Sequence, residues 1–213
     1  MKRRIGLFGG TFDPVHLGHL HAAQVLLDEF SLSEIFFIPA FQPVHRETPQ
    51  ASTEQRLAML KMTLHQQANL HLDEREVVRG GASYALYTLE EYRNEYPDDE
   101  LFFIVGTDAF NAIETWFEWQ TLFTLANFIV LPRPGYGLEV QNELITQRIS
   151  PDIPQNESAE SGKIFLSKKA MLRLSATEVR SAIANNQDID ELLAENVANY
   201  VKDHNIYVKD LLK

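Results

Sequence analysis

The chain of 213 residues contains no cysteine, and this absence limits its chemistry. A disulfide framework, a thiol nucleophile and a thiolate zinc site are all excluded. Any metal ion would have to be held by oxygen atoms, by histidine or by a substrate.

The chain also lacks a long apolar run. The basic residues 2–4 precede only a short apolar segment that glycine interrupts, so we expect neither a secretory signal nor a membrane-spanning segment. The expectation is a cytoplasmic protein without a membrane partner.

Basic residues are in the minority. The formal net charge of -11 argues against nucleic acid as a partner, because nucleic-acid binding usually needs a basic surface. Nucleotides remain acceptable ligands, since their phosphates need only a local basic cluster. The length fits a single domain, residues 1–213, which should bury about 70% of the surface of the unfolded chain.

A short apolar strand, a glycine pair and two histidines follow one another in residues 6–19, GLFGGTFDPVHLGH. Gly9 and Gly10 predict a tight turn that lets backbone amides approach an anion without a Cβ in the way. Thr11 and Phe12 then offer free N–H groups. This segment therefore predicts a phosphate-binding site.

The two histidines belong to the start of the helix that this segment predicts. The dipeptide at 13–14 is a turn and helix-start signal, and apolar residues recur at helical spacing as far as Phe30. His16 and His19 then lie on one face near the positive end of the helix dipole, and Gly18 removes bulk where a ligand would lie. A glycine turn or a capping histidine alone would be ordinary structure, but their conjunction favours a nucleotide-phosphate site.

Strands and helices alternate along the chain. Continuous apolar runs predict strands buried on both faces at 5–8, 35–38, 101–105 and 128–131. Helical spacing predicts helices near 57–64, 84–92, 177–183 and 197–200. This alternation predicts an α/β fold with a doubly wound parallel sheet and a small C-terminal helical part.

Two further features are a candidate helix cap and a long irregular segment. Ser83 is a plausible N-cap for the helix near 84–92. Residues 136–162 are irregular apart from a possible helix near 138–147, and we interpret them as a long connection inside the single domain.

Basic and acidic side chains follow the predicted strands, where ligands bind in open α/β sheets. The prolines of segment 39–46 exclude a regular helix, so His45 and Arg46 lie on a loop; an ordinary surface loop is the alternative. Asp108, after Gly106, could accept hydrogen bonds from a ribose or cap a helix. Trp116 could stack on a pyridine ring or pack in the core.

The segment SATEVR at 175–180 begins with a capping-box pattern. Ser175 and Glu178 alone predict only a well-made helix terminus. Arg180 adds a guanidinium at the same helix end, where a bidentate phosphate contact is natural.

The chain thereby resembles the nucleotidylyltransferase superfamily, whose signature is a His-x-Gly-His motif after a first β-strand. The resemblance extends from the first strand to the last helix. The series of segments downstream of the first motif is similar to that of the bacterial nicotinate-nucleotide adenylyltransferase family. The downstream segments that carry it are PVHR at 43–46, SY at 83–84, TL at 88–89, GTD at 106–108, Trp116, RPG at 133–135 and SATEVR at 175–180.

The resemblance implies a Rossmann-like nucleotidyltransferase fold and adenylyl transfer from ATP to nicotinate mononucleotide. The products would be deamido-NAD and pyrophosphate, in NAD biosynthesis. His16 and His19 would be the catalytic residues, with His19 the stronger candidate at the transition state. Mg²⁺ is expected on the triphosphate, because the sequence shows no dedicated carboxylate cage.

The resemblance also implies binding roles. ATP and its phosphates would contact Gly9, Gly10, Thr11, Phe12, His45, Arg46, Ser175, Thr177 and Arg180. Gly106 and Asp108 would contact a ribose. The mononucleotide would contact Tyr84, Ala85, Trp116, Phe117 and Arg133. Ala85 and Ala176 depart from the usual threonine and serine of the family, which removes a hydroxyl at each position.

Two alternatives remain open. Another adenylyl or cytidylyl transfer, for example to phosphopantetheine, would keep the first motif, and a non-enzymatic nucleotide sensor would keep the glycine pair without needing both histidines.

Overall fold

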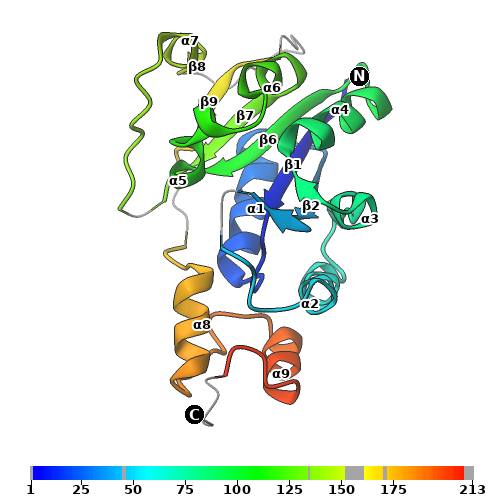
Figure 1. Cartoon of the computed structure of the whole chain (residues 1–213), viewed down its shortest axis with the longest axis vertical. Coiled ribbons are helices and arrows are strands. Elements are labelled where there is room, and N and C mark those ends of the chain that lie inside the picture. The colour runs from blue at the N-terminus through cyan, green and yellow to red at the C-terminus, as the bar shows by residue number, and fades with distance from the viewer. Residues whose placement is uncertain (1, 45–46, 134, 152–160, 170–171, 209–213) are drawn as a thin grey trace.

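The computed structural model describes residues 2–44, 47–133, 135–151, 161–169 and 172–208 (Figure 1). Seven strands form one sheet in the order β4-β2-β1-β6-β7-β9-β8, and every neighbouring pair is parallel. The strands are β1 (Arg4–Gly10), β2 (Glu34–Pro39), β4 (Leu70–Leu72), β6 (Glu100–Gly106), β7 (Asn127–Leu131), β8 (Ile149–Ser150) and β9 (Ile164–Leu166). The predicted doubly wound parallel sheet is confirmed.

The helices lie on both faces of this sheet and below it (Figure 1). They are α1 (Leu17–Glu29), α2 (Thr53–Leu64), α3 (Arg75–Arg79), α4 (Ala85–Glu95), α5 (Thr107–Phe110), the 3-10 helix η1 (Ile113–Thr115), α6 (Trp119–Leu125), α7 (Glu143–Thr146), α8 (Ala176–Ala184) and α9 (Glu195–Asp203). The predicted C-terminal helical part corresponds to α8 and α9, and α9 packs beside α2.

Two hydrophobic clusters cover the two faces of the sheet. Along β6, Phe102 and Ile104 belong to one cluster, whereas Phe103 and Val105 belong to the other, as the two-residue period of a strand requires. The first cluster includes apolar residues of α1, α2, α8 and α9, and the second those of α4 and α6. Burial on both faces explains why the central strands read as continuous apolar runs.

The glycine pair is not a turn, contrary to the sequence expectation. Gly9 and Gly10 continue β1 and pair with Ile38 and Pro39 of β2, so the ladder holds them extended. The chain turns instead at Phe12, which has a φ of 50°. A Cβ at Gly10 would lie 3.0 Å from the Phe12 ring, so glycine is needed there for close packing.

Two local predictions are corrected. Ser83 is not the N-cap of α4, because it belongs to β5 (Ala82–Ser83), which pairs with β3 (Gln42–Pro43), and Tyr84 takes the cap position. The possible helix near 138–147 is only the four-residue α7. Figure 1 shows the chain before α7 as a long connection outside the sheet.

Candidate active site

A cavity of about 840 Å³ opens at the carboxyl ends of the central strands. It lies where β1 separates β2 from β6, the point at which the strand order reverses and ligands bind in doubly wound folds. The sequence-predicted residues that line it are Gly9, Gly10, Thr11, Phe12, His16, His19, Tyr84, Ala85, Gly106, Asp108, Trp116, Phe117, Arg133, Ser175, Thr177 and Arg180. His45 and Arg46 lie outside the described residues.

The two histidines stack on each other at the start of α1. His16 is the N-cap, its ring centroid is 3.7 Å from that of His19, and its backbone N–H donates to Nδ1 of His19 at 3.2 Å. Gly18 also lines the cavity, and a Cβ there would lie 2.9 Å from Nδ1 of His16 and 3.3 Å from Leu174. Glycine is therefore needed to seat the His16 ring.

Both imidazoles are held in the neutral form at pH 7. Burial lowers the pKa of His16 to about 4, and the charge of Arg133 adds to this effect. Burial also lowers the pKa of His19, with smaller contributions from His16 and Arg133. A neutral ring has one N–H donor and no charge to desolvate, so the pair can approach phosphate oxygens as hydrogen-bond donors.

Asp13 connects the histidine segment with three distant parts of the chain. Its Oδ1 accepts from the Tyr207 hydroxyl at 2.7 Å and from the Ala51 N–H at 3.0 Å, and its Oδ2 accepts from the Gln50 N–H at 2.8 Å. Its carbonyl accepts from Nη1 of Arg180 at 2.7 Å. Sequence reasoning treated Asp13 only as a turn signal and did not find these partners, because they lie far away in the chain.

Arg56 is a second residue near the site that sequence reasoning missed. Its side chain is buried, and Nη1 donates to the carbonyls of Thr11 and Ala40, both at 2.8 Å. Burial lowers its pKa, while the nearby charge of Asp13 acts in the opposite direction. The guanidinium therefore ties the ends of β1 and β2 together below the cavity.

Asp108 and Arg133 form an ion pair across the ends of β6 and β7. A Cβ on Gly106 would lie 2.8 Å from Oδ1 of Asp108, so glycine is required for this carboxylate to fold back over the strand end. Thr107 donates its hydroxyl to the carbonyl of Leu131 at 2.7 Å and holds the two strand ends together. The acidic side chain lies in the first turn of α5 but does not cap it, because Gly106 occupies the N-cap position and no side-chain hydrogen bond caps the helix. The ribose contact of Asp108 stays a prediction.

Aromatic side chains line the other end of the cavity. Trp116 lies edge-on against Phe103, with centroids 6.0 Å apart, and still lines the cavity. Packing and stacking are therefore compatible for this ring. Phe117 is exposed and lies 5.0 Å from Tyr84 between ring centroids.

Backbone amides near these rings differ in what they already bind. The N–H of Tyr84 donates to the carbonyl of Ala82 at 3.2 Å, and the N–H of Trp116 donates to that of Ile113 at 3.0 Å. Ala85 is the first residue of α4, a position whose N–H has no acceptor within its own helix. Because the Tyr84 and Trp116 amides are already hydrogen-bonded within the chain, the neighbouring amides of Ala85 and Phe117 are the candidates for a ligand at this end.

The capping box at the start of α8 is confirmed. The Glu178 N–H donates to Oγ of Ser175 at 3.2 Å, and the Ser175 N–H donates to Oε2 of Glu178 at 2.7 Å. Arg180 lies one turn along, with Nη2 at 3.4 Å from Oγ1 of Thr177. The guanidinium therefore lies at the helix end that faces the cavity.

Within the described ranges, no group of three or more His, Cys, Asp or Glu side chains is arranged to hold a metal ion. The helices of those same ranges include none that is long and apolar enough to cross a membrane.

Comparisons with known proteins identify the family of the chain. The family model of cytidylyltransferase-like proteins matches residues 7–182. The chain is 40% identical over 206 residues to a probable nicotinate-nucleotide adenylyltransferase of Hydrogenovibrio crunogenus, covering 97% of this chain and 98% of the relative. It is 36% identical to a protein of the same name from Shewanella frigidimarina, over 96% of this chain and 99% of the relative.

Solved structures share the fold. The chain matches the Plasmodium falciparum nicotinic acid mononucleotide adenylyltransferase complexed with NaAD with a TM-score of 0.73 and 17% identity, over 96% of this chain and 97% of the other. A second structure of that enzyme, complexed with APC, matches with a TM-score of 0.69 and 18% identity, over the same shares of the two chains. The sequence relatives, together with a family model that spans most of the chain, show that this protein belongs to the nicotinate-nucleotide adenylyltransferase family of cytidylyltransferase-like proteins.

Proposed function

We propose that the protein transfers the adenylyl group of ATP to nicotinate mononucleotide and forms deamido-NAD and pyrophosphate, a step of NAD biosynthesis. The observation that carries this proposal is that one cavity joins a stacked histidine pair at its phosphate end to an aromatic surface with available amides at the other. The names of the sequence relatives and of the solved structures support the same pair of substrates.

The reaction needs no covalent enzyme intermediate. A phosphate oxygen of the mononucleotide attacks the α-phosphorus of ATP in line, and the bond from that phosphorus to the oxygen bridging to the β-phosphate breaks. The bridging oxygen leaves with pyrophosphate. Because the nucleophile is already an anion, the protein has to align two mutually repelling anions and stabilise charge on the pentacoordinate centre.

His16 and His19 supply this stabilisation in the proposed mechanism. Their neutral rings lie at the start of α1, so an N–H donor and the positive end of the helix dipole act on the same phosphates. Electrostatic stabilisation of this type acts most strongly where water is excluded, and His16, which is buried, lies in such an environment.

The remaining phosphate contacts are proposed from position. Gly9, Gly10, Thr11 and Phe12 line the cavity beside the histidines, and Ser175, Thr177 and Arg180 line it at the start of α8. His45 and Arg46 stay proposed triphosphate contacts. We place Gly106 and Asp108 against a ribose hydroxyl, with Arg133 beside them.

Mg²⁺ enters as part of the substrate, the magnesium complex of ATP. The described side chains offer no carboxylate cage, so the ion would be bound by triphosphate oxygens and water.

The cavity end lined by Tyr84, Trp116 and Phe117, here called the pyridine end, binds the acid form of the mononucleotide better than the amide form in this proposal. Trp116 provides a stacking surface, and the amides of Ala85 and Phe117 can both donate to a ring carboxylate. The NH₂ group of a nicotinamide ring would face one of these donors, and a buried unmatched donor costs about 1–3 kcal/mol.

The test measures pyrophosphate release with ATP and a panel of acceptors: nicotinate mononucleotide, nicotinamide mononucleotide and phosphopantetheine. The proposal expects the fastest release with nicotinate mononucleotide and a dinucleotide product. Faster release with phosphopantetheine would overturn the proposal and indicate another nucleotidyl transfer of the same superfamily. ATP binding without pyrophosphate release for any acceptor would indicate a nucleotide sensor.

A further inference from the structure

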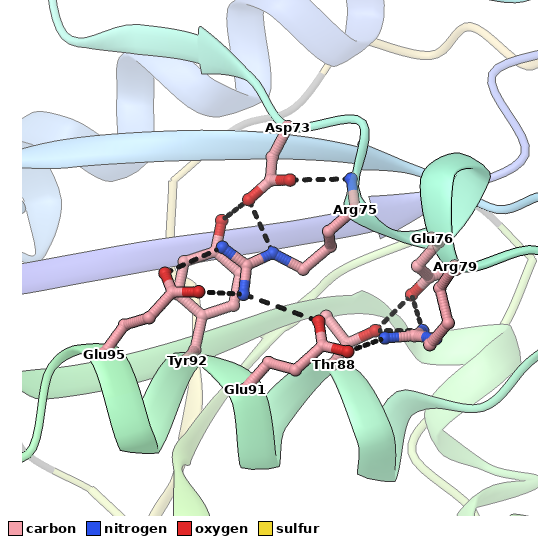
Figure 2. Close-up of polar contacts among 8 residues, drawn as sticks. All are labelled: Asp73, Arg75, Glu76, Arg79, Thr88, Glu91, Tyr92 and Glu95. Atoms are coloured by element: carbon pink, nitrogen blue, oxygen red, sulfur yellow. Dashed lines mark hydrogen bonds and ion pairs between the residues drawn. The ribbon is translucent and has the colours of Figure 1, made fainter.

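A polar network behind the pyridine end of the cavity joins α3 to the inner side of α4 (Figure 2). One member of the network, Glu76, is buried, with only 8% of its surface exposed, and lines the cavity. Oε1 of Glu76 accepts from the hydroxyl of Thr88 at 2.6 Å, and that hydroxyl accepts from Nη2 of Arg79 at 3.0 Å. Thr88 is itself fully buried.

The same carboxylate is connected to the cavity wall. Burial raises the pKa of Glu76, and hydrogen bonds from the hydroxyls of Thr88 and Ser83 act in the opposite direction. Oγ of Ser83 accepts in turn from the N–H of Phe41 at 2.8 Å. Glu76 therefore joins the small β3–β5 sheet to the first turn of α4.

The helix held in this way has no cap of its own. Tyr84 occupies the N-cap position of α4 without a side-chain hydrogen bond, so no local group fixes its first turn. Thr88 lies three residues after Ala85 and is the first side chain of α4 that Figure 2 shows bonded to α3. The direction of the Ala85 N–H thus depends on a contact supplied by another helix.

We propose that Glu76 is a positioning residue for recognition of the mononucleotide: through Thr88 and Ser83 it holds the start of α4 so that the Ala85 amide points at the pyridine carboxylate. This inference rests on the proposed function. It assigns to α3 and its buried carboxylate a part in choosing the acid over the amide, exerted through the position of α4 and not by contact with the substrate.

A direct contact between Glu76 and the ring substituent would have the opposite consequence. A carboxylate accepts hydrogen bonds, attracts the NH₂ of an amide and repels a second carboxylate, so a Glu76 in contact with the substrate would favour nicotinamide mononucleotide. Its removal would then raise the preference for the acid. Removal of a positioning residue lowers that preference, because a misplaced amide costs a carboxylate more than a neutral carboxamide.

The experiment compares Glu76→Gln and Thr88→Val with the wild-type full chain. Each variant is assayed for kcat and KM with ATP, with nicotinate mononucleotide and with nicotinamide mononucleotide. We expect KM for nicotinate mononucleotide to rise about tenfold, KM for ATP to stay within about twofold, and the acid-over-amide ratio of kcat/KM to fall about tenfold.

Two variants serve as controls. Thr88→Ser keeps the hydroxyl and should retain most of the wild-type selectivity. Glu95→Gln makes the same chemical change on α4 that Glu76→Gln makes on α3. Glu95 is exposed and binds Arg75 away from the cavity, so this variant should leave both KM values unchanged. If Thr88→Val fails to fold, Ser83→Ala tests the hold of Glu76 on the start of α4 at a residue that is partly exposed.

The proposal is overturned if the acid-over-amide ratio rises or is unchanged in Glu76→Gln, or if KM for ATP rises as much as KM for the mononucleotide. A wild-type protein that forms no dinucleotide from ATP and nicotinate mononucleotide would instead overturn the proposed function. The two failures are therefore distinguishable in one set of assays.

Discussion

Two helix starts face the same cavity and are built in different ways. α1 begins at two histidines whose rings stack on each other, so the phosphate end obtains its chemistry from side chains of one short segment. α4 begins at Ala85 without a side-chain cap and is held from behind by Thr88 and Glu76. Chemistry at the first helix is local in sequence, whereas at the second it depends on where distant residues hold the backbone.

This difference predicts different kinetic consequences at the two ends. Damage to α1 removes donors that act on the transferring phosphate and should appear in kcat. Damage around α4 misplaces amides that select the substrate and should appear in KM and in substrate preference.

The largest effect is expected at the phosphate end. His19→Ala should lower kcat by about 10²–10⁴ with the fold nearly intact, because it removes a donor to the transition state from a partly open site. His16→Ala should fall in the same range. Steady-state kinetics with a circular dichroism check of folding measures this, with the exposed His65→Ala as the control. Near-normal turnover in folded His19→Ala would show that the His19 side chain does not stabilise the transferring phosphate.

The next effect concerns the pyridine end. The ratio of kcat/KM for nicotinate over nicotinamide mononucleotide should be at least about tenfold to a hundredfold, because the Ala85 and Phe117 amides match a carboxylate and oppose an NH₂ donor. The absence of a threonine hydroxyl at Ala85 could reduce this ratio. Competition of both mononucleotides in one reaction measures it directly. Equal values, or a preference for the amide, would contradict backbone selection at α4.

Burial of the histidines predicts an effect of pH on stability. His16 has a pKa of about 4 in the folded state and about 6.5 when unfolded, so below pH 6.5 the unfolded state binds more protons. The free energy of unfolding should therefore fall as the pH falls from about 6.5 to 4, by about 2 kcal/mol at pH 5 from His16 alone.

Urea unfolding at about pH 7 and pH 5 measures this loss, and His16→Gln should make the dependence shallower. His19 acts in the same direction, since its pKa is also lowered. A stability that is flat over this window would show that the pair is not buried in the neutral form.

The smallest effect is expected at α8. Arg180→Ala should weaken ATP binding about tenfold and mononucleotide binding less, because its guanidinium lies at the helix end that offers a triphosphate contact. Separate titrations of the two substrates measure this. Arg3→Ala removes the same charge at the opposite end of β1 and is the matched control. Loss of mononucleotide affinity with unchanged ATP binding would show that Arg180 contacts the mononucleotide and not ATP.

The phosphate end was largely predictable. The histidine spacing, the strand before it and the helix after it are encoded within residues 4–30, and the structure confirms both elements. The turn was wrong by two residues, because pairing with β2 extends β1 through Gly10 and moves the turn to Phe12. A single strand carries no sign of how far its neighbour will pair with it.

The supports of the site were not predictable. Tyr207 is bound to Asp13, and Arg56 to the carbonyl of Thr11, although each pair is far apart in the chain. Local pattern also misassigned Ser83 as the cap of α4, since its hydroxyl is taken by Phe41 of a neighbouring loop. Side chains such as these have no periodicity or motif that marks them.

The sequence by itself determined the alternation of strands and helices, the order of the site segments and the chemistry of the histidine pair. These follow from apolar periodicity and from contacts between residues a few positions apart. Only the tertiary structure decided which amides remain available beside Trp116, where the first turn of α4 is held, that His16 is buried and that both histidines are neutral. The physical reason is that burial and hydrogen-bond competition depend on every group that packs nearby, and most of those groups come from distant parts of the chain.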